Sequence, residues 1–396
     1  RQLHEPRVML VQAPWGFLNE SQNLLCRAQA LWLKNHFYLQ QRSKERQLHF
    51  IHFNGTAGIW DKSAIAAAGG WSHDTVTEDA DLSYRGALAG FDVRFSPERH
   101  QPSELPANMV AFKAQQNRWT KGYSQIAKKL LCRVLCSRKV SMAFKIEAFY
   151  QLIIQLGEHV VGFTICLLSP LITYFDLFGG HVDFVQWFPL AWVFLGVYYI
   201  ASLFVLPDRP KTFKWFLQSI FSVLVLCFLS IGISAHNTIA YFEGFLMNDN
   251  VFVRTPKEGK AQTPDNASRK AAPEAMTTKT MDALGSNKWQ SYIPKVSWTT
   301  LIELCMAAYL TTFGIIFTIR ALDVSSSSGV EGWLDAIRAS NVSDYRHMIL
   351  LNLFSAAFLW VAIPSVTQKA TTMIFSIVWR LPNQKKMHSD DKACSQ

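Results

Sequence analysis

A short acidic motif, Thr77-Glu78-Asp79-Ala80-Asp81, stands at the start of a predicted helix. The N-terminal end of a helix stabilises a carboxylate, and a carboxylate held in a cleft can take a proton from a hydroxyl group. Positions 79 and 81 diverge by about 200° around a helix, so the two aspartates are not expected to hold one metal ion together. We therefore predict that Asp79 is a general base supported by Thr77 and Glu78. The alternative interpretation is that these residues only cap the helix.

A second candidate group lies in the sequence Gln115-Gln116-Asn117-Arg118-Trp119. Gln115, Arg118 and Trp119 have the i, i+3 and i+4 spacing that places side chains on one face of a helix. An arginine pairs with phosphate oxygens and a tryptophan stacks on the apolar face of a hexose, so this face suits a sugar diphosphate. The alternative is an amphipathic helix at a membrane surface, with Arg and Trp at the interface.

A third candidate is the glycine-containing turn that follows a predicted strand and includes Asn54, Gly55 and Thr56. A glycine lets the backbone approach a ligand closely. We predict a supporting role for these three residues beside the base, and an ordinary turn is the alternative.

A fourth candidate follows an apolar run and leads into a polar linker, and its residues of interest are Phe252, Arg254, Thr255 and Lys257. Such a segment could close over a phosphate-bearing donor, with Arg254 and Lys257 as counter-charges. Basic residues are also common beside membrane spans, which is the alternative explanation.

The elements that must position these residues follow an α/β pattern in the first part of the chain. Short β-prone runs and amphipathic runs predict strands at 8–11 and 49–53 and helices at 21–41, 63–68 and 75–90. Gly69 and Gly70 are expected to end the second helix. Thr75 and Glu78 match a capping box for the third.

The rest of the chain is unusually apolar. Hydrophobic residues make up 49% of the 396 residues and charged residues only 17%, and several runs of about 20 apolar residues are long enough to cross a bilayer. These runs predict spans at 149–175, 187–206, 214–235, 299–321 and 347–368. We expect a cytosolic domain with interfacial helices (1–145), transmembrane or interfacial helices (146–250), a gating-like loop and linker (251–297), further spans (298–370) and a polar tail (371–396).

The charge of the chain fits a membrane surface better than a nucleic acid. The net charge is +10, and residues 111–145 contain nine basic side chains and no acidic one. A basic stretch directly before the first span is typical of a cytosolic segment that faces anionic lipid. No nucleic-acid-binding module accompanies it, so we predict a lipid bilayer and no nucleic acid as partner. Three complete crossings before Phe252 would place that segment outside the cytosol, so we expect an even number there.

Thr77-Glu78-Asp79, followed by Gln115-x-x-Arg118-Trp119 and then by membrane spans, resembles the processive branch of glycosyltransferase family 2. This resemblance covers residues 8 to about 257. It implies the C-terminal part of a GT-A nucleotide-sugar transferase domain followed by a bundle of transmembrane helices. It also implies that Asp79 is the base, and that Gln115, Arg118 and Trp119 hold the donor diphosphate and the acceptor. The segment from Phe252 to Lys257 is similar to the gating loop of cellulose synthases, with Arg254 in place of Val.

The resemblance extends to particular substrates. Leu10-Val11-Gln12-Ala13, the turn at 53–58, Gly69-Gly70-Trp71 and Glu104-Leu105-Pro106 look most like the cellulose synthase-like A group and its bacterial relatives. That group implies synthesis of β-1,4-mannan or glucomannan from GDP-mannose and GDP-glucose, onto a growing β-glycan. β-Glucan synthesis from UDP-glucose is similar at these positions. The implied location is a multi-pass membrane protein of the Golgi or plasma membrane with a cytosolic catalytic part.

The family pattern also includes an upstream Asp-x-Asp that positions Mg²⁺ or Mn²⁺ on the diphosphate, and no suitable second Asp-x-Asp occurs in this chain. We therefore expect no metal ligand in this chain, an N-terminal truncation, and poor donor binding by the chain alone. Two alternatives to a processive polymerase stay open, namely an inactive remnant or membrane scaffold and a non-processive transferase that acts on a lipid.

Overall fold

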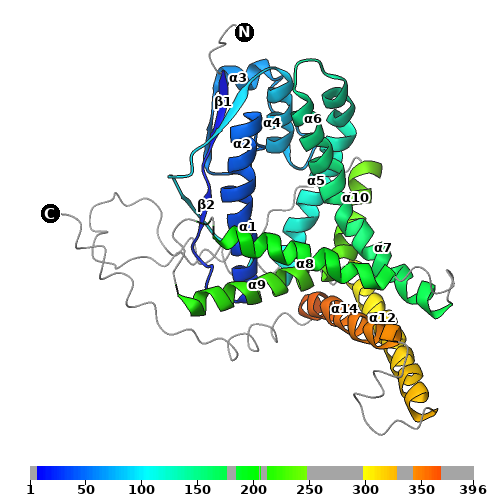
Figure 1. Cartoon of the computed structure of the whole chain (residues 1–396). Coiled ribbons are helices and arrows are strands. Elements are labelled where there is room, and N and C mark those ends of the chain that lie inside the picture. The colour runs from blue at the N-terminus through cyan, green and yellow to red at the C-terminus, as the bar shows by residue number, and fades with distance from the viewer. Residues whose placement is uncertain are drawn as a thin grey trace, which may run out of the picture.

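The computed structural model describes residues 7–175, 184–204, 206, 212–247, 298–327 and 342–366 (Figure 1). Three predicted features lie outside the described residues. They are the linker, the polar tail, and the gating-like residues Phe252, Arg254, Thr255 and Lys257. The strands are β1 (Val8–Gln12), β2 (Trp15–Phe17), β3 (Gly58–Trp60), β4 (Asp92–Phe95) and β5 (Gln101–Ser103). The first helices are α1 (Leu24–Asn35), η1 (His36–Gln41), α2 (Arg42–Leu48), α3 (Lys62–Ala67), α4 (Glu78–Leu88) and α5 (Met109–Cys136).

The later helices are α6 (Met142–Phe149), η2 (Tyr150–Ile154), α7 (Gln155–Tyr174), α8 (Phe184–Leu203), α9 (Phe213–Gly232), α10 (Ser234–Leu246), α12 (Trp298–Ser327) and α14 (Val342–Val366). α1, η1 and α2 follow one another without a break, which extends the helix predicted at 21–41. α5 is capped by Asn108, whose side chain accepts a hydrogen bond from the Ala111 backbone N–H at 2.8 Å. Its 28 residues make a rod about 42 Å long.

The strands form two small sheets. In the first, β1 lies in the centre and pairs with β4 in parallel and with β3 in antiparallel orientation, and in the second β2 pairs in parallel with β5. The strand predicted at 49–53 is wrong, since β3 occurs a few residues later. The reason is tertiary, because side chains from distant parts of the sequence bind the backbone at the end of this segment. The Phe53 N–H donates to Ser83 Oγ at 3.0 Å, and the Asn54 N–H donates to Gln12 Oε1 at 3.1 Å.

The helix that carries Asp79 is shorter than predicted. α4 begins at Glu78, its N-cap is Thr77, and the Thr77 side chain makes no capping hydrogen bond. The predicted capping box of Thr75 and Glu78 is therefore wrong. Residues 75–77 are instead buried against α5, where the Val76 N–H donates to Gln125 Oε1 at 2.9 Å. The predicted helix at 63–68 is confirmed as α3, and Gly69 and Gly70 follow it with φ of +90° and +73°.

Four helical segments in the described part of the chain are long and apolar enough to cross a membrane. They are Met142–Tyr174, Phe213–Gly232, Trp298–Arg320 and His347–Val366, and they correspond to four of the five predicted spans. α8 covers most of the fifth. The predicted run 214–235 divides near Ile233 into α9 and α10, and α10 packs on α5 rather than continuing α9. How many helices cross the bilayer before Phe252 stays a prediction.

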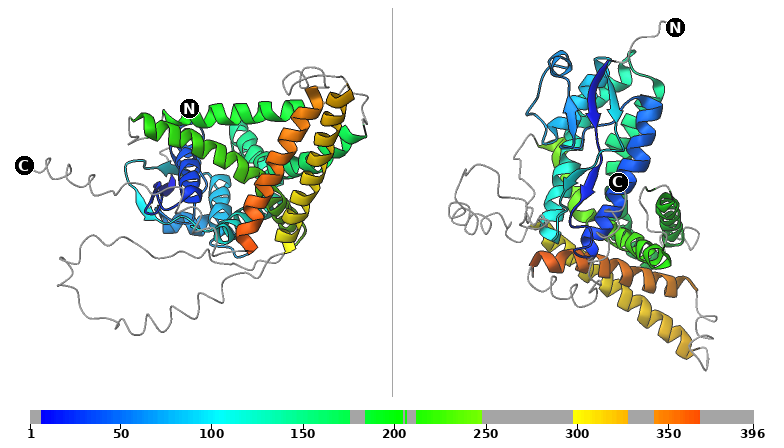
Figure 2. Two further views of the ribbon diagram at one scale, coloured as in Figure 1. Left: turned by 90° about the horizontal axis from the view of Figure 1, so that it is seen from below. Right: turned by 90° about the vertical axis from the view of Figure 1, so that its left-hand side faces the viewer.

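The α/β layer formed by β1, α4 and α5 shares one hydrophobic core with the apolar helices. The largest buried cluster combines residues of β1, α4 and α5 with Tyr199 and Leu203 of α8 and Val223 and Cys227 of α9. Farther along the chain, α12 and α14 lie side by side beneath this layer (Figures 1 and 2). α4 and α5 are thus held directly on the apolar helices.

A buried ion pair joins α5 to the last two helices. Lys113 Nζ lies 2.7 Å from Glu303 Oε2, and their side chains are only 6% and 0% exposed. The same ammonium group lies 3.3 Å from Thr300 Oγ1 and 3.4 Å from Ser365 Oγ. His236 of α10 adds a contact between its Nε2 and the Lys113 carbonyl oxygen at 3.1 Å. This cluster fixes the start of α5 against α10, α12 and α14.

Candidate active site

The structure brings the predicted base and the predicted turn together. Asp79 lies in the first turn of α4 and is half-buried. A Cβ placed on Gly55 would lie 3.5 Å from Asp79 Oδ2, so the turn at Asn54, Gly55 and Thr56 borders the carboxylate. Gly55 has a φ of +83°, a conformation that favours glycine. Residues that are separate in sequence therefore form one site.

Two buried side chains hold the turn in place. Gln12, at the end of β1, accepts from the Asn54 N–H and donates from Nε2 to the Thr56 carbonyl at 3.0 Å. Ser83 accepts from the Phe53 N–H, and its hydroxyl donates to the Asp79 carbonyl at 2.8 Å. Ser83 thus links the turn directly to the residue that carries the base. Neither Gln12 nor Ser83 was predicted as a site residue, since neither belongs to a motif that signals chemistry.

The surroundings of Asp79 favour its neutral form more than water does. Burial, with a smaller contribution from the neighbouring Glu78 carboxylate, raises the pKa of Asp79 to about 7, although the Ala80 backbone N–H and Arg118 oppose the rise. A carboxylate with a pKa near neutral can both take up and release a proton at physiological pH. Burial also lowers the pKa of Arg118, and Asp79 and Glu78 oppose that change. The predicted base and Arg118 therefore influence each other electrostatically.

Asp81 has a different environment from Asp79. Its side chain is fully buried, with Arg85 Nε at 2.7 Å from Oδ2 and Lys129 Nζ at 2.8 Å from Oδ1. The two aspartates therefore diverge, as the helical geometry predicts. The part of the chain that the structure describes has no group of three or more His, Cys, Asp or Glu side chains that could hold a metal ion. The described residues therefore do not fit a metal centre, and no catalytic step is assigned to a metal.

Gln115, Arg118 and Trp119 lie together on α5, as their spacing predicts. Gln115 is buried, whereas Arg118 and Trp119 are half-buried. The Trp119 ring lies 6.1 Å from the Trp32 ring of α1, with the planes tilted by 52°. Of these three residues, Arg118 acts electrostatically on Asp79 at the start of α4, whereas Trp119 contacts α1.

The same face of α5 carries two further residues that the motif search missed. A Cβ on Gly122 would lie 2.4 Å from Thr77 Oγ1, so only a glycine lets α5 approach the N-terminus of α4 this closely. Tyr123 packs edge-to-face on His52 with ring centroids 5.4 Å apart. Burial raises the pKa of Tyr123 well above its usual value, and the Asp79 charge adds to the effect. The spacing of i+7 and i+8 from Gln115 could have indicated both residues.

Comparison with known proteins identifies the class to which this fold and site belong. Residues 1–233 match the family described as Glycosyl transferase family group 2. The chain therefore belongs to that family, and the predicted fold class, part of a GT-A domain followed by apolar helices, is confirmed.

Within this family, the chain is similar to glucomannan 4-beta-mannosyltransferases. Glucomannan 4-beta-mannosyltransferase 1 of Oryza sativa subsp. japonica is 32% identical over 275 residues, which cover 68% of this chain and 50% of that protein. Glucomannan 4-beta-mannosyltransferase 9 of Arabidopsis thaliana is 29% identical over 271 residues, which cover 68% of this chain and 49% of that protein. The chain spans about half the length of the curated relatives that it matches.

Proposed function

We propose that this chain is part of a membrane-embedded, inverting glycosyltransferase that polymerises a hexose into a β-linked glycan of the mannan, glucomannan or β-glucan type. The observation that supports it best is the site at Asp79, where a carboxyl with a pKa of about 7 borders the turn at Gly55 and interacts electrostatically with Arg118. Family membership supplies the reaction class, and the names of the relatives, glucomannan 4-beta-mannosyltransferases, favour mannose as the transferred sugar.

In the proposed reaction, Asp79 takes the proton of an acceptor hydroxyl, and the hydroxyl oxygen attacks the anomeric carbon of the donor sugar. The bond from that carbon to the diphosphate oxygen breaks, and the nucleoside diphosphate leaves with the bonding electron pair. A single displacement inverts the anomeric centre without a covalent enzyme intermediate. Arg118 stabilises the charge that develops on the diphosphate, Gln115 supports the bound group, and Trp119 stacks on the acceptor ring.

The donors proposed for this site are GDP-mannose, GDP-glucose or UDP-glucose, and the acceptor is the growing β-glycan. Mg²⁺ or Mn²⁺, when bound, would neutralise the diphosphate, and the absence of its ligands from this chain stays a prediction. We further propose that the protein is a multi-pass protein of the Golgi or plasma membrane with a cytosolic site. Residues 252–257 keep their predicted role as a gating loop over the donor.

The decisive test replaces Asp79 by Asn in the protein expressed at its full natural length in membranes. Incorporation of labelled sugar should fall by about 10²–10⁴-fold, the usual contribution of a general base, while the amount of protein in the membrane stays unchanged. Asp92→Asn, at the start of β4, is the matched control and should keep normal activity.

Polymer synthesis by the Asp79→Asn variant at the normal rate would remove Asp79 from the role of base. Product length decides between the remaining candidates, since a lipid that carries one added sugar would indicate a non-processive transferase. Failure of the natural protein to transfer sugar from any of the three donors would favour an inactive remnant.

A further inference from the structure

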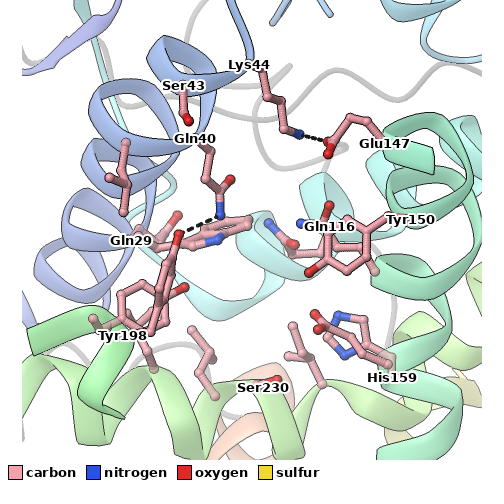
Figure 3. A pocket seen from close by; sticks show the side chains of 18 of the residues that line it. Gln29, Gln40, Ser43, Lys44, Gln116, Glu147, Tyr150, His159, Tyr198 and Ser230 are labelled. Atoms are coloured by element: carbon pink, nitrogen blue, oxygen red, sulfur yellow. Dashed lines mark hydrogen bonds and ion pairs between the residues drawn. The ribbon is translucent and has the colours of Figure 1, made fainter. Parts of the chain in front are cut away.

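A cavity of about 640 Å³ lies away from Asp79, where the α1–η1–α2 helix meets the apolar helices α7, α8 and α9 (Figure 3). Neither Asp79 nor the residues of the turn at Gly55 line it. α5 contributes Gln116 and Phe112 to its wall, and Trp32 of α1 lines it while contacting Trp119 of the proposed site. The cavity is therefore a neighbour of the site but is built from other residues.

Two buried amides on this wall have polar atoms without a protein partner. Gln29 Nε2 donates to the Leu25 carbonyl at 3.2 Å and to the Pro106 carbonyl at 2.9 Å, which leaves Oε1 without a hydrogen bond among the described residues. Gln116 Nε2 likewise has no acceptor in the described part of the chain. These side chains are only 1% and 6% exposed. Because buried polar groups are normally hydrogen-bonded, one free acceptor and one free donor in a cavity wall indicate a ligand that can both donate and accept.

The remaining lining combines aromatic and aliphatic side chains with polar ones, of which Lys44, Glu147, Glu158 and His159 are ionisable. Tyr150 and Tyr198 lie on opposite sides of the cavity (Figure 3), and the Tyr198 hydroxyl is held by Gln40 Nε2 at 3.2 Å and by Asn35 Oδ1 at 3.0 Å. Aliphatic residues of α9, Leu226 and Leu229, also line it.

The charges in the lining do not favour an anionic ligand. Lys44 Nζ and Glu147 Oε1 form an ion pair at 2.5 Å across the cavity, so the ammonium group is already neutralised (Figure 3). A nucleotide diphosphate needs cationic partners and does not fit such a lining. The lining instead matches a sugar, because its amides can hydrogen-bond to hydroxyl groups and its aromatic rings can stack on the apolar face of a sugar ring.

We propose that this cavity is a second saccharide site, which binds one or more neutral hexose rings through Gln29, Gln116 and Trp32. The choice of a hexose rests on the function proposed above, whereas the preference for a neutral, hydroxyl-rich ring rests on the cavity alone. The ring can come from two sources, a soluble β-glycan or the sugar headgroup of a membrane glycolipid, because apolar helices form part of the wall.

The test measures binding rather than catalysis, with the protein reconstituted in nanodiscs. β-1,4-Mannohexaose is the soluble probe, followed by isothermal titration calorimetry, and a hexosyl diacylglycerol in the nanodisc is the lipid probe, followed by native mass spectrometry. Gln29→Leu and Gln116→Leu should each weaken binding of whichever probe the natural protein binds. The affinity should fall at least about tenfold, which is the effect of losing one sugar hydrogen bond in a buried site. Gln101→Leu, on the exposed strand β5, is the matched control and should bind normally.

Thermal denaturation accompanies each variant. Gln116→Leu removes an unpaired buried donor and should leave the melting temperature unchanged or higher, whereas Gln29→Leu also removes the hydrogen bonds to the Leu25 and Pro106 carbonyls and should lower it. Binding is therefore compared at a temperature at which both variants are folded. Retention of the soluble probe assigns the site to glycan, and retention of the lipid probe alone assigns it to glycolipid. Binding of neither probe, or binding that both leucine substitutions leave unchanged, would overturn the proposal. Asp79→Asn should keep the cavity's affinity, so the two proposals can fail independently.

Discussion

The charged groups of Lys113 and Asp79 differ in whether an oppositely charged side chain is paired with them. Lys113 reaches Glu303 at 2.7 Å and has two hydroxyl groups nearby, so its charge is compensated. Asp79 forms no ion pair with the described residues, although Arg118 acts on it electrostatically, and burial raises its pKa to about 7. Both lie on or against α5. The comparison teaches that compensated charges hold this helix in position, whereas the uncompensated one is available for proton transfer.

The largest expected effect on stability comes from breaking the compensated pair. Lys113→Met should destabilise the protein by about 3–5 kcal/mol, because it leaves the Glu303 carboxylate buried without its partner. Thermal melting of the purified protein in detergent measures the effect. The double variant Lys113→Met with Glu303→Leu should recover most of the loss. If the double variant is as unstable as the single one, the pair does not act as a unit.

A smaller effect is expected where α5 meets the N-terminus of α4. Gly122→Ala should cost about 1–3 kcal/mol, because the added Cβ would lie 2.4 Å from Thr77 Oγ1. The shift of Thr77 should also move Asp79. The rate of sugar transfer should therefore fall by more than the loss of folded protein alone would explain. The control is Gly157→Ala in α7, where a Cβ meets no atom within 4 Å. Equal activity of the two alanine variants would contradict the role assigned to Gly122.

The pH dependence tests the uncompensated charge. A base must be ionised, so a pKa of about 7 for Asp79 predicts that transfer falls about tenfold per pH unit below pH 7. The pH profile of sugar incorporation in membranes measures this, and a profile that stays flat down to pH 5 would contradict the raised pKa.

Stability should follow the opposite trend. The folded pKa of Asp79 lies above the ordinary value of 3.8, so the folded state binds the proton more tightly than the unfolded state. Its contribution to stability is therefore present below about pH 4 and is lost as the pH rises toward 7. Asp79→Asn should melt at a higher temperature than the natural protein at pH 8 and should remove this part of the pH dependence.

The smallest effect is expected for an exposed pair. Lys34 Nζ lies 2.6 Å from Glu20 Oε2, but both side chains are about one-third exposed. Lys34→Ala should therefore change the free energy of unfolding by about 1 kcal/mol or less. A loss as large as that of Lys113→Met would show that ion-pair burial does not govern these effects.

The local features of the site could be predicted from the sequence. The spacing of Gln115, Arg118 and Trp119 places them on one helical face wherever the helix lies, and a run of 20 apolar residues remains apolar in any fold. The strand predicted at 49–53 failed because its β-prone composition was outweighed by distant side chains. Gln12 and Ser83 bind the backbone there, at positions 42 and 30 residues away in sequence.

Composition, periodicity and motif spacing were thus sufficient to indicate the candidate chemical groups, the helix that carries the proposed sugar-binding face and the apolar helices, since these are properties of short stretches. Only the tertiary structure placed Gly55 beside Asp79, Gly122 against Thr77, and Lys113 on Glu303 across 190 residues of sequence. It alone also revealed that Gln29 Oε1 and Gln116 Nε2 have no hydrogen-bond partner among the described residues. The physical reason is that burial, and with it the pKa of a carboxyl or the lack of a hydrogen-bond partner, depends on which distant segments pack together.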